Sequence, residues 1–289
     1  MGEIISVSKE MIKLPRRQRD SHKGNYGKIL VVAGSEGYTG APVFAAQGAL
    51  RSGAGLVYLG VPRDVYPIVA TRCSSEMPFP LPEDPDDCVE RAKTCDVILA
   101  GPGMGRSPWA QQLIEKLITQ VEKPLVLDAD GLNALEGRTQ LLRQRKGLTV
   151  LTPHDGEFAR LAGCALPLHD RVEQARQLAR DTGCVVVLKG RETLTVEPHG
   201  RVWRNTTGNP GMAKGGSGDI LAGMIASFLG QKQLAERVSC PAELVAWAVC
   251  CHGAAGDAAA ALCGEYGVLP DDTLRAVAGI LKAQTQTEG

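Results

Sequence analysis

The alternation of short apolar runs with longer amphipathic or Ala-rich segments most restricts the fold of this chain. The runs have the length of strands and the segments between them have the length of helices. This order predicts βαβ units, and hence an α/β fold with a doubly wound, mainly parallel sheet covered by helices on both faces. The expected strands are residues 29–33, 56–61, 97–100, 125–128, 149–152 and 184–188. The expected helices among them include residues 42–52, 108–120 and 170–181.

The pattern changes after residue 188. Residues 193–197 and 201–203 flank the turn signal at residues 198–200 and predict an antiparallel hairpin. The remaining expected elements are helices at residues 216–229, 242–262 and 271–282, a surface loop at the Pro- and acid-rich residues 78–87, and an amphipathic lead-in helix within residues 3–20. Without an internal repeat, residues 1–289 are expected to form a single domain in which residues 1–20 are the N-terminal lead-in.

Composition narrows the class of protein. The 32 basic residues balance the 32 acidic ones, which argues against a nucleic-acid partner or an acidic membrane surface. The nine cysteines contain no CxxC pair, which favours a reducing compartment over disulfides or structural zinc. Cys250 and Cys251 are expected to be small core residues of a helix. With no apolar segment of signal-peptide or membrane-spanning length recognised, we expect a cytoplasmic protein without a membrane partner.

Polar or Gly-rich turns follow five of the expected strands. In an open α/β sheet, ligands bind outside the carboxyl ends of the strands. Such turns are commonly rich in Gly and Asp, so one of them alone is uninformative, but five together indicate a site along this edge. The turns are residues 34–42, 101–105, 128–133, 152–157 and 189–193.

The stretch NTTGNPGMAKGGSGD, residues 205–219, precedes an apolar helix and carries the clearest chemical signal. Its glycines let backbone N–H groups approach a ligand, and the helix presents its positive end to an anion. We therefore expect an anion hole at Gly215, Gly216, Ser217 and Gly218. Asp219 is then either an ordinary first-turn acid of the helix or the base that accepts a hydroxyl proton during phosphoryl transfer.

Three familiar fingerprints fail at this stretch. No GxxxxGK[ST] pattern occurs, so the chain is not a P-loop protein. Leu221 stands where a GxGxxG pattern needs glycine, and Asp219 stands where the GxSxG of serine hydrolases needs glycine. The dehydrogenase, P-loop and hydrolase classes are excluded together.

Seven segments, in order along the chain, resemble the NAD(P)H-hydrate dehydratases of the ribokinase-like superfamily. They are SHKGNYG (21–27), YTGAP (38–42), GPGMG (101–105), LDADGLN (127–133), LTPHDGEF (151–158), VLKG (187–190) and residues 208–219, and the resemblance continues to about residue 257. It implies a ribokinase-like fold and the repair of hydrated reduced nicotinamide nucleotides. In that reaction a nucleotide phosphorylates the ring hydroxyl of the S-epimer of NADHX or NADPHX, and phosphate then leaves to restore NAD(P)H.

The resemblance also implies roles for individual residues. Lys189, Gly190, Arg191, Glu192, Thr193 and Gly218 are expected to bind ADP or AMP. Ala41, Gly103, His154 and Asp219, with Gly105 as a less certain neighbour, are expected to contact the hydrated dinucleotide, and Asp219 is the expected catalytic base. Lys214 is a further candidate for a phosphate. Asp128 and Asp130 either serve magnesium or water, or cap the turn at Gly131, so no metal ligands are assigned.

Cofactors and partners follow from the same resemblance. Mg²⁺ is expected with the charged nucleotide, and ADP is preferred over ATP as phosphoryl donor. A homotetramer is expected, and a separate epimerase is expected as a functional partner because about twenty residues before the first motif are too few for a fused one. The alternatives are an ATP-dependent version of the dehydratase, a kinase of a small vitamin precursor such as hydroxyethylthiazole, and a catalytically inactive nucleotide-binding regulator.

Overall fold

In the computed structural model, residues 3–285 are described, and they form one ten-stranded sheet in the order β1-β10-β9-β8-β7-β6-β5-β2-β3-β4. The strands are β1 Ile4–Val7, β2 Lys28–Val32, β3 Leu56–Val61, β4 Met77–Pro80, β5 Val97–Ala100, β6 Leu125–Leu127, β7 Thr149–Leu151, β8 Val185–Leu188, β9 Leu194–Val196 and β10 Val202–Asn205. All neighbouring strands run parallel except β9, which is antiparallel to both β8 and β10. The predicted parallel sheet and the predicted hairpin are confirmed.

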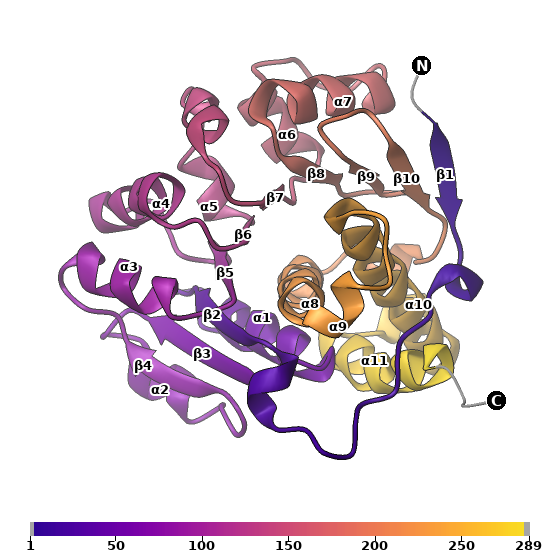
Figure 1. Ribbon diagram of the computed structural model, residues 1–289, viewed down its shortest axis with the longest axis horizontal. Helices are drawn as coiled ribbons and strands as arrows, with labels where there is room; N and C mark the ends of the chain where they lie inside the picture. The colour runs from indigo at the N-terminus through magenta and orange to yellow at the C-terminus, as the bar shows by residue number, and fades with distance from the viewer. Residues whose placement is uncertain (1–2, 286–289) are drawn as a thin grey trace.

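Helices cover both faces of this sheet (Figure 1). The helices are α1 Gly40–Arg51, α2 Tyr66–Ala70, α3 Pro85–Lys93, α4 Pro108–Gln120, α5 Asp130–Asn133, α6 Asp155–Ala162, α7 Arg171–Thr182, α8 Ser217–Gly230, α9 Lys232–Ala235, α10 Pro241–Gly267 and α11 Pro270–Gln284. Short 3₁₀ turns lie at Lys9–Met11, Lys23–Tyr26, Thr139–Gln144 and Pro210–Met212. One core packs α1, α8, α10 and α11 against the sheet, and a second core packs α3, α4 and α7 against its other face.

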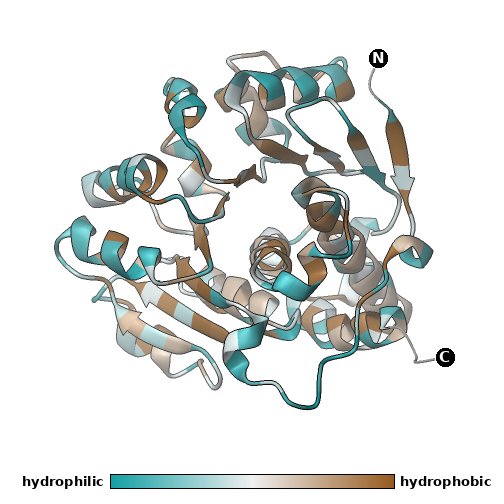
Figure 2. Ribbon diagram, viewed as in Figure 1, coloured by the Kyte–Doolittle hydropathy of each residue, from teal (hydrophilic) through white to brown (hydrophobic). Residues whose placement is uncertain are grey.

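The central strands are apolar at every position because both of their faces are buried. All four residues of β5 (VILA) and all four of β8 (VVVL) are buried. Along β2, Ile29 and Val31 belong to one core while Leu30 and Val32 belong to the other. In Figure 2 the central strands are mostly brown, whereas teal dominates the outer helices and the segment that leads into β2.

Helix α8 lies in the middle of the first core and fixes the place of residues 215–219. Its interior residues 220–228 are buried without exception. It approaches α1 closely because glycines face each other's backbone: a Cβ on Gly223 would lie 2.0 Å from the Ala45 carbonyl oxygen, and one on Gly48 would lie 2.5 Å from that of Ile220. The N-terminus of α8 is thereby held at the carboxyl edge of the sheet.

Among the described residues, α10 is the one helix long and apolar enough to cross a membrane, and 78% of its apolar window is buried inside the fold. A segment of this kind was not expected from the sequence. Packing accounts for the composition, since α10 contacts α8, α11 and the sheet. Cys250 and Cys251 are both fully buried on it, as expected.

Two expectations were wrong. Residues 78–87 are not a loop: β4 pairs with β3, and α3 begins at Pro85 with the Asp84 side chain accepting the Asp86 N–H at 2.9 Å. Proline is tolerated in an edge strand and favoured in the first turn of a helix, so its frequency was misleading here. Residues 3–20 contain no α-helix. Instead β1 pairs in parallel with β10, as its β-branched residues Ile4, Ile5 and Val7 favour.

Candidate active site

The parallel register brings the turns after β2, β5, β6, β7 and β8 to one edge of the sheet, where α8 begins. Three residues predicted to contact the dinucleotide lie on one side of this edge. A Cβ on Gly103 would lie 3.1 Å from that of Ala41, and the Gly105 N–H donates to Asp130 Oδ2 at 2.8 Å. A cavity of about 290 Å³ begins at Gly105 and Asp130 and extends past Arg106 and Arg138.

The turn after β6 separates two neighbouring carboxylates. Ala129, between Asp128 and Asp130, has φ +48° and ψ −115°, a conformation that non-glycine residues rarely adopt. Asp130 turns toward Gly105 and Asn133, whose amide nitrogen lies 3.1 Å from its Oδ1. Asp128 turns the other way and is 2% exposed. The pair was expected either to serve magnesium or water, or to cap the turn at Gly131. Asp130 does help to organise this turn, whereas Asp128 faces Lys189.

His154 begins α6 and uses one ring nitrogen as a helix cap. Its ring Nδ1 accepts the backbone N–H groups of Gly156 at 3.0 Å and Glu157 at 3.3 Å. In return, a Glu157 carboxylate oxygen accepts the backbone N–H of His154 at 2.9 Å. Because Nδ1 is an acceptor, the ring proton is on Nε2. His154 therefore offers a substrate a hydrogen-bond donor and already fulfils the ordinary structural role of a turn histidine.

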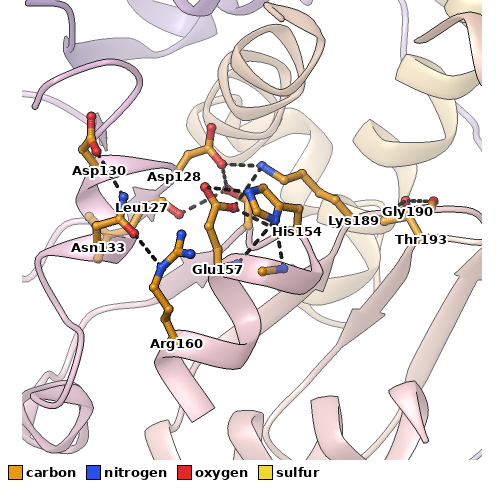
Figure 3. Close-up of polar contacts among 12 residues, drawn as sticks. Leu127, Asp128, Asp130, Asn133, His154, Glu157, Arg160, Lys189, Gly190 and Thr193 are labelled. Carbon is orange, nitrogen blue, oxygen red and sulfur yellow. Dashed lines mark hydrogen bonds and ion pairs between the residues drawn. The ribbon is translucent and has the colours of Figure 1, made fainter. Parts of the chain in front are cut away.

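The Lys189 ammonium is surrounded by carboxylates (Figure 3). Its Nζ lies 2.7 Å from Asp128 Oδ1 and 3.8 Å from Glu157 Oε2. Burial alone would lower the pKa of Lys189, but Asp128, Glu157 and Asp219 together raise it above the ordinary value. A Cβ on Gly218 would lie 3.4 Å from this ammonium, so two predicted nucleotide contacts are neighbours. A permanently charged ammonium beside an anion hole is suited to a phosphate.

The rest of the predicted nucleotide segment forms the turn between β8 and β9. Gly190 has φ +147°, and a Cβ there would lie 2.8 Å from the Arg171 guanidinium, which also donates to the Lys189 carbonyl at 2.9 Å. Thr193 Oγ1 donates to the Gly190 carbonyl at 2.9 Å. Arg191 and Glu192 are exposed. Of this segment, Lys189 is the residue whose charge acts on the pKa of Asp219.

Asp219 lies in the first turn of α8, next to the Gly-rich anion loop of residues 205–218. Burial and the nearby charges of Asp128 and Glu157 raise the pKa of Asp219 to about 7, against the opposing effect of Lys189. A carboxyl group with such a pKa is suited to accept a proton near neutral pH. Such a value also goes beyond what an ordinary helix-start acid needs.

Helix α10 holds the anion loop in place. Asp257 accepts the Gly208 N–H and the Asn209 side-chain amide, both at 2.9 Å. Lys214, expected as a possible phosphate contact, instead donates to the carbonyls of Tyr266 at 2.8 Å and Val268 at 2.6 Å. Its charge ties the loop to the end of α10.

Three residues of this site were not predicted from the sequence: Glu157, Thr152 and His252. Glu157 stands three residues after His154, a capping-box spacing that was readable. His252 is buried on α10, bonded to the Ser217 backbone, and its Nε2 has no partner among the described residues. Burial, aided by Lys189, lowers the pKa of His252 to about 4, so the ring is neutral. His252 lies in an Ala-rich helix, and no local sequence signal indicated that it packs against the start of α8.

No group of three or more His, Cys, Asp or Glu side chains suited to a metal ion occurs among residues 3–285. In the site, the two carboxylates of Asp128 and Glu157 lie beside the single ammonium of Lys189, so negative charge is in excess. The described side chains therefore form no preassembled metal cage, but their charge fits a divalent cation that arrives on nucleotide phosphates.

An anion loop and a half-buried Asp219 at the start of the central helix of a mainly parallel sheet define a ribokinase-like protein. A solved ribokinase-like superfamily protein from Enterococcus faecalis V583 is similar to this chain with a TM-score of 0.84 and 29% identity, covering 98% of this chain and 97% of that one. Within this class, the chain belongs to the NAD(P)H-hydrate dehydratase family, whose family model matches residues 29–278.

Individual relatives agree with this assignment. The solved ADP/ATP-dependent NAD(P)H-hydrate dehydratase of Bacillus subtilis, co-crystallised with ATP and Mg²⁺, is 33% identical with a TM-score of 0.80, covering 94% of this chain and 95% of that one. The ADP-dependent (S)-NAD(P)H-hydrate dehydratase of Neisseria meningitidis is 36% identical over 83% of this chain and 80% of its own length. The chain spans about half the length of longer curated relatives, such as the bifunctional NAD(P)H-hydrate repair enzyme Nnr of Moorella thermoacetica, which is 44% identical over 91% of this chain and 50% of its own length.

Proposed function

We propose that this chain restores NAD(P)H from the S-epimer of its hydrate, with ADP as phosphoryl donor and AMP and phosphate as products. The observation that carries the proposal is the placement of Asp219, with its raised pKa, beside the Lys189 ammonium at the anion loop. Family membership and the nucleotide named for the relatives from B. subtilis and N. meningitidis support it.

The geometry supports two chemical stages. In the first, Asp219 accepts the proton of the ring hydroxyl while its oxygen attacks the terminal phosphoryl group, and AMP leaves. The anion loop and Lys189 face the charge that develops on the phosphoryl oxygens. In the second stage the ring nitrogen lone pair expels phosphate from the adjacent carbon. Loss of a proton from the neighbouring ring carbon then restores the 5,6 double bond, so the added water ends in phosphate.

The roles of the remaining residues belong to the same proposal. Lys189–Thr193 and Gly218 bind the nucleotide, while Ala41, Gly103, Gly105 and His154 contact the dinucleotide. His154 supplies an Nε2 proton, so its partner must be an acceptor such as a phosphate or carboxamide oxygen. Mg²⁺ would neutralise the nucleotide phosphates when bound, next to the Asp128 side of the site.

The test is turnover of chemically hydrated NADH, followed by the return of the reduced-nicotinamide absorbance. ADP and ATP are supplied separately, and the appearance of AMP or ADP identifies the phosphoryl donor. Replacement of Asp219→Asn should abolish turnover and spare nucleotide binding measured by calorimetry. Full activity of this variant would contradict the role of Asp219. A stable phosphorylated vitamin precursor without NADH recovery would favour the kinase alternative.

The family resemblance supports further proposals about the whole protein. We propose a single domain, a cytoplasmic location, a homotetramer and functional dependence on a separate epimerase. Light scattering of the purified chain measures the oligomeric state. Turnover of the R-epimer should require an added epimerase, whereas turnover of the S-epimer should not.

A further inference from the structure

Asp128 has no assigned role, although it is among the most buried charged residues of the site. Its Oδ1 contacts two donors, the Thr152 hydroxyl and the Lys189 ammonium, each at 2.7 Å. Buried carboxylates are stable only when they are paired and hydrogen-bonded, and both conditions are met here. The Asp128–Lys189 pair is therefore fixed by packing, unlike a flexible surface ion pair.

Glu157 holds the same ammonium from a second direction. One of its oxygens accepts the His154 N–H and lies 3.8 Å from Lys189 Nζ. The side chain thus connects the cap of α6, on the dinucleotide side, with the cation on the nucleotide side (Figure 3). An ammonium has three donors, so Lys189 is able to keep Asp128 and contact a phosphate at the same time.

We propose that Asp128 is a positioning residue that holds the Lys189 ammonium beside Gly218 and Asp219, where the transferring phosphoryl group must pass. This inference rests on the proposed function and adds to it a residue that need not touch either substrate. Without Asp128, the more distant Glu157 would be the remaining ion-pair partner of Lys189 among residues 3–285, and the flexible four-carbon stem would be less restrained.

The charges around Asp219 give the proposal a distinctive signature. Asp128 and Glu157 raise the pKa of Asp219, and Lys189 lowers it. Removing Lys189 should therefore shift the titration of Asp219 to higher pH. If Asp128 holds the ammonium in place, Asp128→Asn acts on Asp219 both directly and through Lys189, so its effect should differ between the wild-type chain and a Lys189→Met background. An Asp128 that does not position Lys189 should have the same effect in both backgrounds.

Other charged groups near α8 are accounted for. His252 of α10 faces the start of α8 and is neutral because of its low pKa. Lys214 is bound to carbonyls of residues 266 and 268. The acidic start of α11 follows Pro270, which packs near Gly216, and its Asp272 accepts the Leu269 N–H at 2.9 Å. The charged residue of α1 is Arg51, at the opposite end of that helix.

The experiment compares Asp128→Asn with Lys189→Met, using kcat/KM for the hydrate over pH 5.5–9 and calorimetric ADP binding. For Asp128→Asn in the otherwise wild-type chain we expect ADP binding at least about threefold weaker, whereas in a Lys189→Met background we expect the same substitution to leave ADP binding unchanged and to move the acidic limb to lower pH. For Lys189→Met we expect the limb to move to higher pH and ADP binding to weaken more. Asp130→Asn, which changes the neighbouring carboxylate on the other side of the turn, should not move the limb.

Equal effects of Asp128→Asn on ADP binding and on the acidic limb in the two backgrounds would overturn the inference while leaving Asp219 as the base. If the wild-type chain shows no turnover, the proposed function fails, and a carboxyl ¹³C titration of Asp219 with ADP binding still decides the inference. In that case an Asp219 titration unchanged by Asp128→Asn, with ADP binding intact, would overturn it.

Discussion

The Asp257 carboxylate accepts the Gly208 N–H at 2.9 Å, which ties the loop before α8 to the middle of α10. Its other oxygen accepts the side-chain amide of Asn209, and Asn209 in turn accepts the Gly211 N–H at 3.0 Å. The loop that carries the predicted anion hole is thus held by side chains rather than by a strand ladder, and Asp257 makes two of these contacts.

Replacement of Asp257→Ala should therefore weaken the anion loop. Two hydrogen bonds to a charged acceptor are lost, so we expect a decrease of about 1–3 kcal/mol in the free energy of unfolding and a several-fold increase in the KM for nucleotide. Urea unfolding and steady-state kinetics measure the two effects. The exposed Glu265→Ala on the same helix is the control and should change neither. An unchanged nucleotide KM in Asp257→Ala would mean that the loop keeps its shape alone.

The pH dependence of turnover should follow the proton on Asp219. Since a base must be deprotonated to act and the pKa of Asp219 is raised to about 7, kcat/KM should rise with pH through neutrality and level off above it. Well below pH 7 we expect roughly a tenfold loss per pH unit. A rate that is flat between pH 5.5 and 8 would argue against Asp219 as the titrating base.

The same raised pKa makes Asp219 costly to the fold. Folding favours its protonated form, so this favourable contribution is complete below the ordinary pKa of 3.8 and is lost as the pH rises through about 7. The Asp219→Asn variant should therefore be nearly as stable as wild type at pH 4 and more stable at pH 8. We expect a difference of about 2 kcal/mol at pH 8, less than the full pKa shift would give, because solvent screens the partly exposed side chain. Thermal unfolding at both pH values tests this. Equal stability at pH 8 would show that the carboxylate carries no such cost.

His252 predicts a pH dependence of stability in another range. Its pKa is lowered from 6.5 to about 4, so between these values the unfolded chain binds a proton that the folded chain excludes. Its contribution is complete above pH 6.5 and falls as the pH decreases toward 4, by up to about 3 kcal/mol. His252→Gln should remove this part of the dependence in unfolding experiments, whereas the exposed turn residue His199→Gln should keep it. Parallel curves for wild type and His252→Gln would refute the assignment.

The contact between α1 and α8 tests whether backbone approach positions the base. Gly223→Ala places a Cβ 2.0 Å from the Ala45 carbonyl oxygen and should destabilise the fold by about 2 kcal/mol or more, despite the better helix propensity of alanine. The exposed Gly279→Ala on α11 meets nothing within 4 Å and should stabilise by up to about 1 kcal/mol. Chemical unfolding of both variants measures this contrast. A neutral Gly223→Ala would show that the two helices separate easily.

The sequence predicted the parts of the fold in which local pattern and tertiary environment agree. Residues 56–61, 97–100 and 108–120 were predicted with the bounds that the structure has, because buried central strands and an N-capped amphipathic helix have strong local signals. It failed where proline was read only as a loop former, at residues 78–87. It also failed at β1, where pairing with β10, nearly two hundred residues away, decides the conformation.

The site divides in the same way. The anion loop and Asp219 were readable because glycine spacing before an apolar helix has a direct physical meaning. The mutual arrangement of Asp128, Lys189 and Glu157 was not, since the three residues follow different strands and only the register of β6, β7 and β8 brings them together. The assigned contacts of the individual residues remain predictions for binding experiments.

Ala129 connects these features through its reversed backbone. Since its neighbours Asp128 and Asp130 point to opposite sides of the turn, this one residue joins the Lys189 ammonium, on the side predicted for the nucleotide, to the Gly105 amide, on the side predicted for the dinucleotide. A rotation of the backbone at Ala129 would have to displace both carboxylates together with the groups that they bind. Binding at the predicted dinucleotide site should therefore change binding at the predicted nucleotide site. The affinity for ADP should differ between the free protein and the protein loaded with hydrate.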